Sequence, residues 1–102
     1  SKALRAPLII VGITSPKAHP KVPLLEQQQS TAAALQNIIN AAFALNVGAI
    51  WRTGGMATHA IVREGLGLSP EEEITGFIYL GEVDGPLRPL KPEDPSLYFQ
   101  EW

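Results

Sequence analysis

The most informative stretch of this chain is VGAIWRTGGM, residues 47–56. Its first half is apolar and predicts a short extended segment that ends at Trp51. The two adjacent glycines that follow predict a turn, because glycine relaxes the restriction on φ. Such a turn exposes backbone N–H groups to a flat ligand, and Arg52 adds a charged, planar donor group. In the alternative interpretation Trp51 is a core residue, Arg52 is a surface charge and the glycines only reverse the chain. These residues alone leave both interpretations open.

Composition limits the classes of protein to be considered. The chain has 102 residues, 45% of them hydrophobic and 18% charged, which is typical of a globular domain or part of one. Its net charge of −2 and its scattered basic residues argue against a nucleic-acid partner. Without cysteine there is no disulfide framework and no thiolate site. No apolar run is long enough for a membrane span or a signal peptide, so we expect a cytoplasmic protein.

Two continuous apolar runs and one long helical pattern predict the main elements. Residues 8–13 and 74–81 have the length and β-branched content of buried strands, and we expect the first to be a central strand. Residues 23–46 predict a helix with Pro23 in its first turn and a second half that is buried. Its small residues 30–34 would allow another backbone to approach closely. Strands separated by a helix favour a layered α/β arrangement.

The remaining segments predict shorter elements. Thr58 is positioned to cap a short helix that ends near Gly65, and Ser69 is positioned to cap another with acidic residues in its first turn. From residue 82 onward four prolines predict an extended arm that ends in aromatic residues. Two buried strands and one long helix make a thin core, so we expect further strands from a missing half or from a partner subunit.

Most single residues are weak candidates for catalysis. His19 and His59 are forty residues apart and lack companion ligands, which makes a metal site improbable on spacing alone. None of the serines lies in a nucleophile elbow. The acidic run at residues 71–73 is better explained as a solvated helical turn than as an acid and base pair. The Gly65 and Gly67 pair does not follow a strand and therefore is no dinucleotide fingerprint.

Four blocks of sequence carry a family resemblance. They are RAPLII at residues 5–10, HPKVP followed by EQ at residues 19–27, NVGAIWRTG at residues 46–54 and GFIYLG at residues 76–81. In this order and at this spacing they resemble the C-terminal half of the small bacterial FMN-dependent nitroreductases, the YdjA-like group. The resemblance covers nearly the whole chain, and four blocks in register are more specific than any one of them.

The resemblance implies an α+β sandwich in which two subunits swap arms and share two FMN sites at the homodimer interface. It implies an enzyme whose flavin takes hydride from NADH or NADPH and passes electrons to a nitroaromatic or quinone-like acceptor. The long helix would form the dimer, and the terminal aromatic residues would pack the arm onto a neighbour.

The resemblance also implies which residues bind the cofactors. The family's flavin-contacting segment corresponds to Trp51, Arg52, Thr53 and Gly54. A segment assigned to nicotinamide dinucleotide binding in relatives corresponds to Ala41, Ala42, Phe43, Ala44, Leu45 and Asn46. Arg88 is a candidate for the flavin phosphate. No residue is implied as catalytic.

One large departure limits the resemblance. Family members begin with a helix that bears a phosphate-binding Arg-Arg-Ser type of motif, and residues 1–102 contain no such half. We therefore expect a single partial domain, which could be a fragment, a truncated gene product or one piece of a cleaved protein. The alternative function is a flavin-free interaction or dimerisation module without catalysis.

Overall fold

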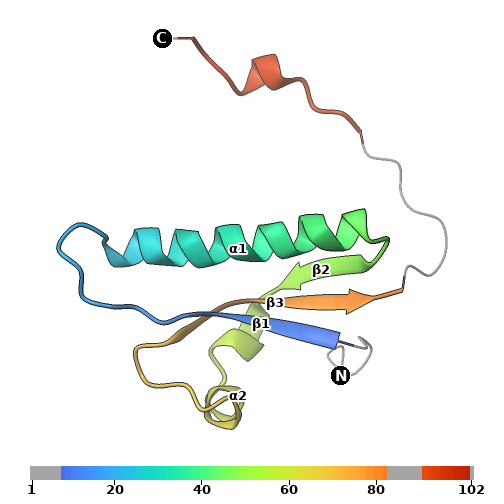
Figure 1. Cartoon of the computed structure of the whole chain (residues 1–102). Coiled ribbons are helices and arrows are strands. Elements are labelled where there is room, and N and C mark those ends of the chain that lie inside the picture. The colour runs from blue at the N-terminus through green and yellow to red at the C-terminus, as the bar shows by residue number, and fades with distance from the viewer. Residues whose placement is uncertain (1–7, 83–90, 102) are drawn as a thin grey trace.

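The computed structural model describes residues 8–82 and 91–101. Its elements in chain order are β1 (Leu8–Thr14), α1 (Leu24–Ala44), β2 (Gly48–Arg52), η2 (Gly54–Ala57), α2 (Ala60–Gly65), β3 (Glu73–Gly81) and η3 (Pro95–Leu97), where η2 and η3 are short turns of 3-10 helix. The long helix α1 lies across one face of the sheet, and α2 lies on the other side (Figure 1). The molecule is therefore built in α+β layers.

The three described strands form one sheet in the order β1-β3-β2. Both pairings are antiparallel, with Val11 opposite Phe77 in one and Trp51 opposite Ile78 in the other. The prediction that the first strand is central was wrong for this sheet. The strand β3 is central because it alone pairs on both edges, and β1 lies at an edge with Leu8 exposed. The predicted burial holds for β3, where Ile74, Phe77 and Ile78 are buried, whereas no apolar side chain of β1 is buried. Apolar content gave no information on strand order.

The helix α1 begins one residue after Pro23, which is its N-cap and not a first-turn residue. Residues with high helix propensity fill its length, and Leu35 and Ala42 are buried against the sheet. The helix ends before Asn46, whose φ of 60° is the left-handed conformation typical of a helix C-terminus. The prediction that its second half is buried was wrong, since Phe43 and Leu45 point away from the sheet and are 78% and 74% exposed.

Two glycines leave room for large side chains on the face of the sheet that α1 covers. A Cβ atom added to Gly12 would lie 2.6 Å from both Leu35 methyl carbons, and one added to Gly76 would lie 2.8 Å from Cε2 of Trp51. Gly12 and Gly76 are themselves opposite one another across β1 and β3. The Leu35 side chain and the Trp51 indole thus occupy the space that these two glycines leave free.

A chain of three threonine hydroxyls joins the polar end of α1 to the sheet. The Thr14 hydroxyl donates to Thr31 at 2.9 Å and lies 2.5 Å from the Thr75 hydroxyl. Because a hydroxyl carries one proton, Thr75 is the donor in the second hydrogen bond. Thr31 in turn donates to the backbone carbonyl of Gln27 at 3.3 Å. All three hydroxyls therefore have a partner although Thr14 is buried.

Replacing Thr14 with valine should lower the free energy of unfolding by about 1–3 kcal/mol. The substitution keeps the shape of the side chain but leaves the half-buried Thr75 hydroxyl without its acceptor beside the buried position 14. Urea denaturation followed by circular dichroism measures the loss. Thr58→Val is the matched control, because Thr58 is exposed and bonds only the backbone of its own turn. Equal effects of the two substitutions would show that the hydroxyl chain does not stabilise the fold.

The C-terminal segment, residues 91–101, is exposed along its whole length. Its single turn, η3, is capped by Asp94, whose carboxylate accepts hydrogen bonds from the Ser96 backbone and hydroxyl. The segment runs apart from the sheet (Figure 1). The extended arm predicted from residue 82 is described only in this part, where Leu97, Tyr98 and Phe99 expose their side chains.

Candidate functional site

The strand β2 sends its last two side chains to opposite faces of the sheet. Directly opposed residues of antiparallel strands share a face, so Gly12 and Gly76 lie on the face that Leu35 of α1 covers. The Trp51 indole packs over Gly76 on this same face. Arg52 follows Trp51 and therefore faces the other way, because side chains alternate along a strand. The side chains of Trp51 and Arg52 cannot both contact one ligand.

The Trp51 side chain is consequently a packing element between the sheet and α1. Trp51 is half-buried, so it meets the alternative interpretation as a core residue only in part, and its assignment to the flavin stays a prediction. Arg52 is exposed, and within residues 8–82 and 91–101 its guanidinium makes no hydrogen bond or ion pair with another side chain.

The segment after β2 is the glycine turn, defined here as residues 53–57. Its first glycine, Gly54, has a φ of 62°, which disfavours any residue with a side chain. A Cβ atom at Gly54 or Gly55 would meet nothing within 4 Å. The turn is closed by the N–H groups of Thr58 and His59, which donate to the carbonyls of Gly55 and Met56. The turn thus presents open, glycine-lined backbone beside the Arg52 side chain.

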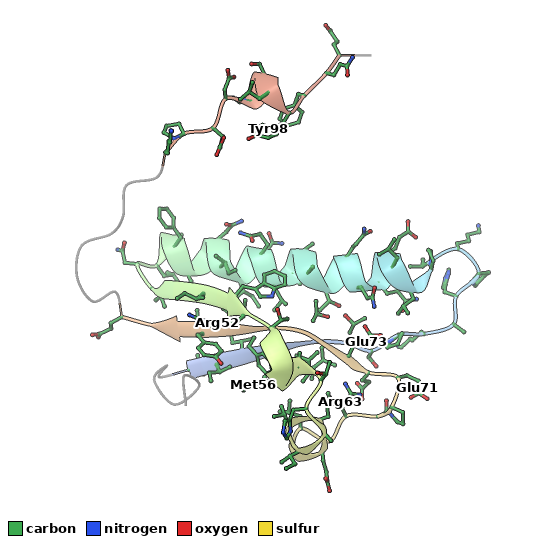
Figure 2. The ribbon with its side chains drawn as sticks, turned by 180° about the vertical axis from the view of Figure 1, so that it is seen from behind. Arg52, Met56, Arg63, Glu71, Glu73 and Tyr98 are labelled. Atoms are coloured by element: carbon green, nitrogen blue, oxygen red, sulfur yellow. The ribbon has the colours of Figure 1, made fainter. Side chains whose placement is uncertain are left out.

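The glycine turn packs on β3 through Met56. The Tyr79 hydroxyl lies 4.0 Å from the Met56 sulfur, a distance at which a thioether is a weak acceptor. Arg52 and Met56 both lie at the end of β2 where the chain leaves the sheet (Figure 2). Tyr79 pairs with Ile50 and so belongs to the same face as Arg52. The face that carries the candidate site is the one opposite α1.

The connection from the glycine turn to β3 differs from the sequence-based prediction at both of its caps. His59, and not Thr58, caps α2, because its Nδ1 atom accepts from the N–H of Ile61 at 3.2 Å. No helix follows Ser69, since its carbonyl and that of Glu72 both accept from the Arg63 guanidinium, at 3.1 and 2.7 Å. The Glu72 carboxylate folds back to accept from the N–H of Ser69 at 3.0 Å. Arg63 competes for the carbonyls that a helix would use.

This arrangement predicts a pH dependence of stability. The Ser69 N–H donating to the carboxylate lowers the pKa of Glu72 below its ordinary value of 4.5, with lesser support from Ser15 and Arg63. A depressed folded-state pKa stabilises the fold above pH 4.5, and this contribution is lost as the pH falls below 4.5. In urea denaturation at a series of pH values, the stability difference between wild type and Glu72→Gln should shrink in that acid range. A stability difference that stays constant across that range would contradict a stabilising role of the Ser69 hydrogen bond.

The other residues predicted for the site lie elsewhere. Residues 41–44 form the C-terminal end of α1 and residues 45–46 the turn after it, where the Val47 N–H donates to the Ala42 carbonyl at 2.8 Å. This end precedes β2, whereas the glycine turn follows it, so the two are separated by the length of the strand. One chain therefore does not bring the predicted nicotinamide segment to the glycine turn, and this assignment stays a prediction. Arg88 lies outside the described residues.

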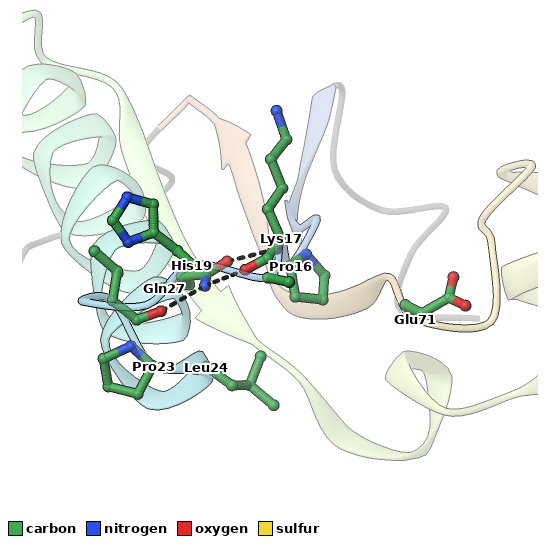
Figure 3. A pocket seen from close by; sticks show the side chains of 9 residues that line it. Pro16, Lys17, His19, Pro23, Leu24, Gln27 and Glu71 are labelled. Atoms are coloured by element: carbon green, nitrogen blue, oxygen red, sulfur yellow. Dashed lines mark hydrogen bonds between the residues drawn. The ribbon is translucent and has the colours of Figure 1, made fainter.

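Sequence reasoning missed two side chains that organise loops. The first is Arg63, described above. The second is Gln27, whose carboxamide bonds the N–H and carbonyl of Lys17 and the carbonyl of Val22, each at 2.9 Å. This side chain holds the loop before α1, which borders a shallow cavity of about 360 Å³ that also contacts His19 and Glu71 (Figure 3). Neither side chain belongs to a catalytic or ligand-binding pattern, which is why spacing alone did not reveal it.

Comparison with known proteins decides the family. The family described as "Nitroreductase family" matches residues 1–82 of this chain. The chain belongs to the nitroreductase family. Proteins named "Putative NAD(P)H nitroreductase YdjA" from Escherichia coli K12 and Escherichia coli O157:H7 are each 40% identical to this nitroreductase-family chain over 77 residues. The match covers 76% of this chain and 42% of either relative, so the chain spans less than half their length.

A solved structure supports the fold of this nitroreductase-family chain. It is described as the crystal structure of a nitroreductase-like family protein from Bacillus cereus and matches with a TM-score of 0.75 over 95% of this chain and 51% of that protein. At 23% identity this likeness supports the fold alone. Among the described residues of this family member, no helix is long and apolar enough to cross a membrane.

Alanine substitutions at Gly54 and Gly55 test the conformation of the glycine turn in this nitroreductase-family chain. Gly54→Ala should lower the free energy of unfolding by about 1 kcal/mol, because its φ of 62° is unfavourable for alanine. Gly55→Ala should change the stability by less than about 0.5 kcal/mol, because its φ is not positive and the space beside it is open. Thermal unfolding compares them. The turn would have a different conformation if Gly55→Ala were the more damaging substitution.

Proposed function

We propose that this chain is part of an FMN-dependent NAD(P)H oxidoreductase of the nitroreductase type, and that the glycine turn lies against the flavin. Family membership and the name of the YdjA relatives support the reaction class. The observation that carries the proposal is the open, glycine-lined backbone directly after β2, beside the exposed Arg52. The acceptor is proposed to be a small nitroaromatic or quinone-like molecule.

The residues of the turn fit a flat, hydrogen-bonding cofactor. Any other residue type would place a side chain beside the backbone at positions 54 and 55. Glycine leaves this space open, so a ring system can approach the backbone at both positions. When bound, FMN supplies the redox chemistry by accepting hydride from NAD(P)H and passing electrons to the acceptor. The protein's part is to bind and orient it through backbone N–H groups of residues 53–55 and the Arg52 guanidinium. Trp51 contributes by bracing β2 against α1.

The whole assembly is proposed to be a homodimer in the cytoplasm. The outer side of α1 exposes the small residues Ser30, Ala33 and Ala34, which would allow a second helix to pack closely. The exposed Leu97, Tyr98 and Phe99 would pack the arm onto the neighbouring subunit. Since this chain spans 42% of the length of its relatives, the rest of the site is proposed to come from a further part of the domain and from the partner.

A second candidate function is a flavin-free interaction module. It is favoured by the exposed apolar side chains Phe43 and Leu45 at the end of α1, which form no part of the glycine turn. Purified protein distinguishes the two functions by colour. Bound flavin absorbs visible light and supports the oxidoreductase, whereas a colourless, stable oligomer supports the interaction module.

The experiment that tests the proposed function is a titration of FMN with purified protein that carries this chain together with the rest of its domain, followed by quenching of flavin fluorescence. Arg52→Met should weaken binding by at least about tenfold, because a charged hydrogen bond contributes about 1.5–3 kcal/mol and about 1.4 kcal/mol is tenfold. Lys21→Met is the matched control, since it removes an equal charge from an exposed position on a different loop. Equal affinities of wild type and Arg52→Met would remove Arg52 from the site, and no saturable binding by the wild type would contradict the proposed function.

A further inference from the structure

The glycine turn is held between two anchors. On its N-terminal side Arg52 lies in the ladder of β2 with β3, opposite Phe77. On its C-terminal side the chain passes directly into α2, which begins at Ala60 after the His59 cap. A helix of six residues is far too short to be stable by itself. The position of the turn therefore depends on what holds α2 to the rest of the molecule.

Arg63 makes the polar contacts that hold α2. Its guanidinium donates to the Ser69 carbonyl at 3.1 Å and to the Glu72 carbonyl at 2.7 Å. Glu72 immediately precedes β3, the central strand. Arg63 lies between α2 and the segment that leads into β3 (Figure 2). The half-buried Arg63 side chain thus connects α2 to Glu72, the residue immediately before the central strand.

The remaining contacts of this region are weaker. The Met56 sulfur is 4.0 Å from the Tyr79 hydroxyl, and the two hydrogen bonds that close the turn are long, at 3.3 and 3.4 Å. Hydrogen bonds from a charged donor are roughly twice as strong as those between neutral groups. The loss of the guanidinium therefore removes the strongest polar contact between α2, into which the turn leads, and the segment that precedes β3.

We infer that Arg63 is a positioning residue, which holds the glycine turn in its ligand-binding conformation without touching the ligand. The part of this inference that concerns a ligand rests on the proposed function. When the turn spends less time in the competent conformation, the apparent dissociation constant rises by the inverse of the competent fraction. A turn that is already held in the binding conformation therefore binds its ligand more tightly.

The test compares Arg63→Met with Glu64→Gln by amide hydrogen exchange of the purified chain. Methionine keeps the length of the aliphatic stem without the donors, and Glu64→Gln alters a charge at the exposed neighbouring residue. In Arg63→Met, exchange at Thr58 and His59 should accelerate at least about tenfold, whereas Val11 and Ile78 of the sheet should exchange as in the wild type. Glu64→Gln should leave both sets unchanged.

Two results would overturn the inference. Unchanged exchange at Thr58 and His59 would show that the turn is held without Arg63. Equal acceleration at every protected amide would show that Arg63 only stabilises the fold as a whole. A titration with FMN of protein that carries this chain together with the rest of its domain adds a second readout, in which folded Arg63→Met should bind about tenfold more weakly than Glu64→Gln. If the wild type does not bind FMN but exchange changes as expected, the proposed function fails and the positioning role stands.

Discussion

Replacing Gly76 with alanine should lower the free energy of unfolding by about 3 kcal/mol. The added Cβ would overlap Nε1 of the Trp51 indole and come within 2.8 Å of its Cε2 atom. Gly76 is buried in the central strand and an indole is rigid. Moving either the backbone or the ring to relieve the overlap therefore costs free energy. Urea denaturation followed by circular dichroism measures the loss.

Two further variants make this prediction specific. Gly65→Ala is the matched control, because a Cβ at Gly65 in α2 would meet nothing within 4 Å, and it should not destabilise the chain. Trp51→Leu combined with Gly76→Ala should lose less stability than the two single substitutions added together, since the overlap is then absent. A cost below about 0.5 kcal/mol for Gly76→Ala would mean that the indole does not lie over Gly76.

Truncation of Leu35 to alanine should cost about 2–5 kcal/mol of unfolding free energy. Leu35 is 2% exposed and is the α1 residue that enters the space left by Gly12. The truncation loses the burial of its methyl groups and leaves a cavity between helix and sheet. Leu25→Ala, at a position of the same helix that is 63% exposed, should cost less than about 1 kcal/mol.

Substitutions at Gly12 test whether Leu35 packs directly against this glycine. Gly12→Ala alone should destabilise the chain, because its Cβ would lie 2.6 Å from the Leu35 methyl carbons. In the double variant the alanine at position 12 occupies part of the cavity, so the combined loss should be smaller than the sum. Strict additivity would contradict direct packing of these two residues.

Hydrophobic pattern predicted the main elements of the fold because it reports which faces are buried. The long helix, the two apolar strands and the short strand before the glycines all occur, with α1 at Leu24–Ala44 and β3 at Glu73–Gly81. Strand order was not predictable in this way, since β1 and β3 have similar composition although only β3 is central. The same limit explains Phe43 and Leu45, which are apolar but face away from the sheet.

The candidate site was predictable as a segment but not in its side-chain directions. Two adjacent glycines after a strand indicated a turn, and the turn occurs at Gly54–Ala57. That Trp51 and Arg52 face opposite sides follows from strand alternation, but the side that Trp51 takes depends on Gly76, twenty-five residues away. Arg63 illustrates the same point, because its partners are carbonyls and a backbone carbonyl has no sequence signature.

The measurement that tests the central claim most directly is a titration of FMN into isotope-labelled protein that carries this chain together with the rest of its domain, followed by two-dimensional NMR of the backbone amides. If the glycine turn binds the flavin, saturable shifts should appear at Arg52, Thr53, Gly54 and Gly55. The amides of residues 17–24, beside the cavity at the other loop, should not shift. The absence of saturable shifts, or shifts confined to residues 17–24, would contradict the assignment of the glycine turn as the flavin site.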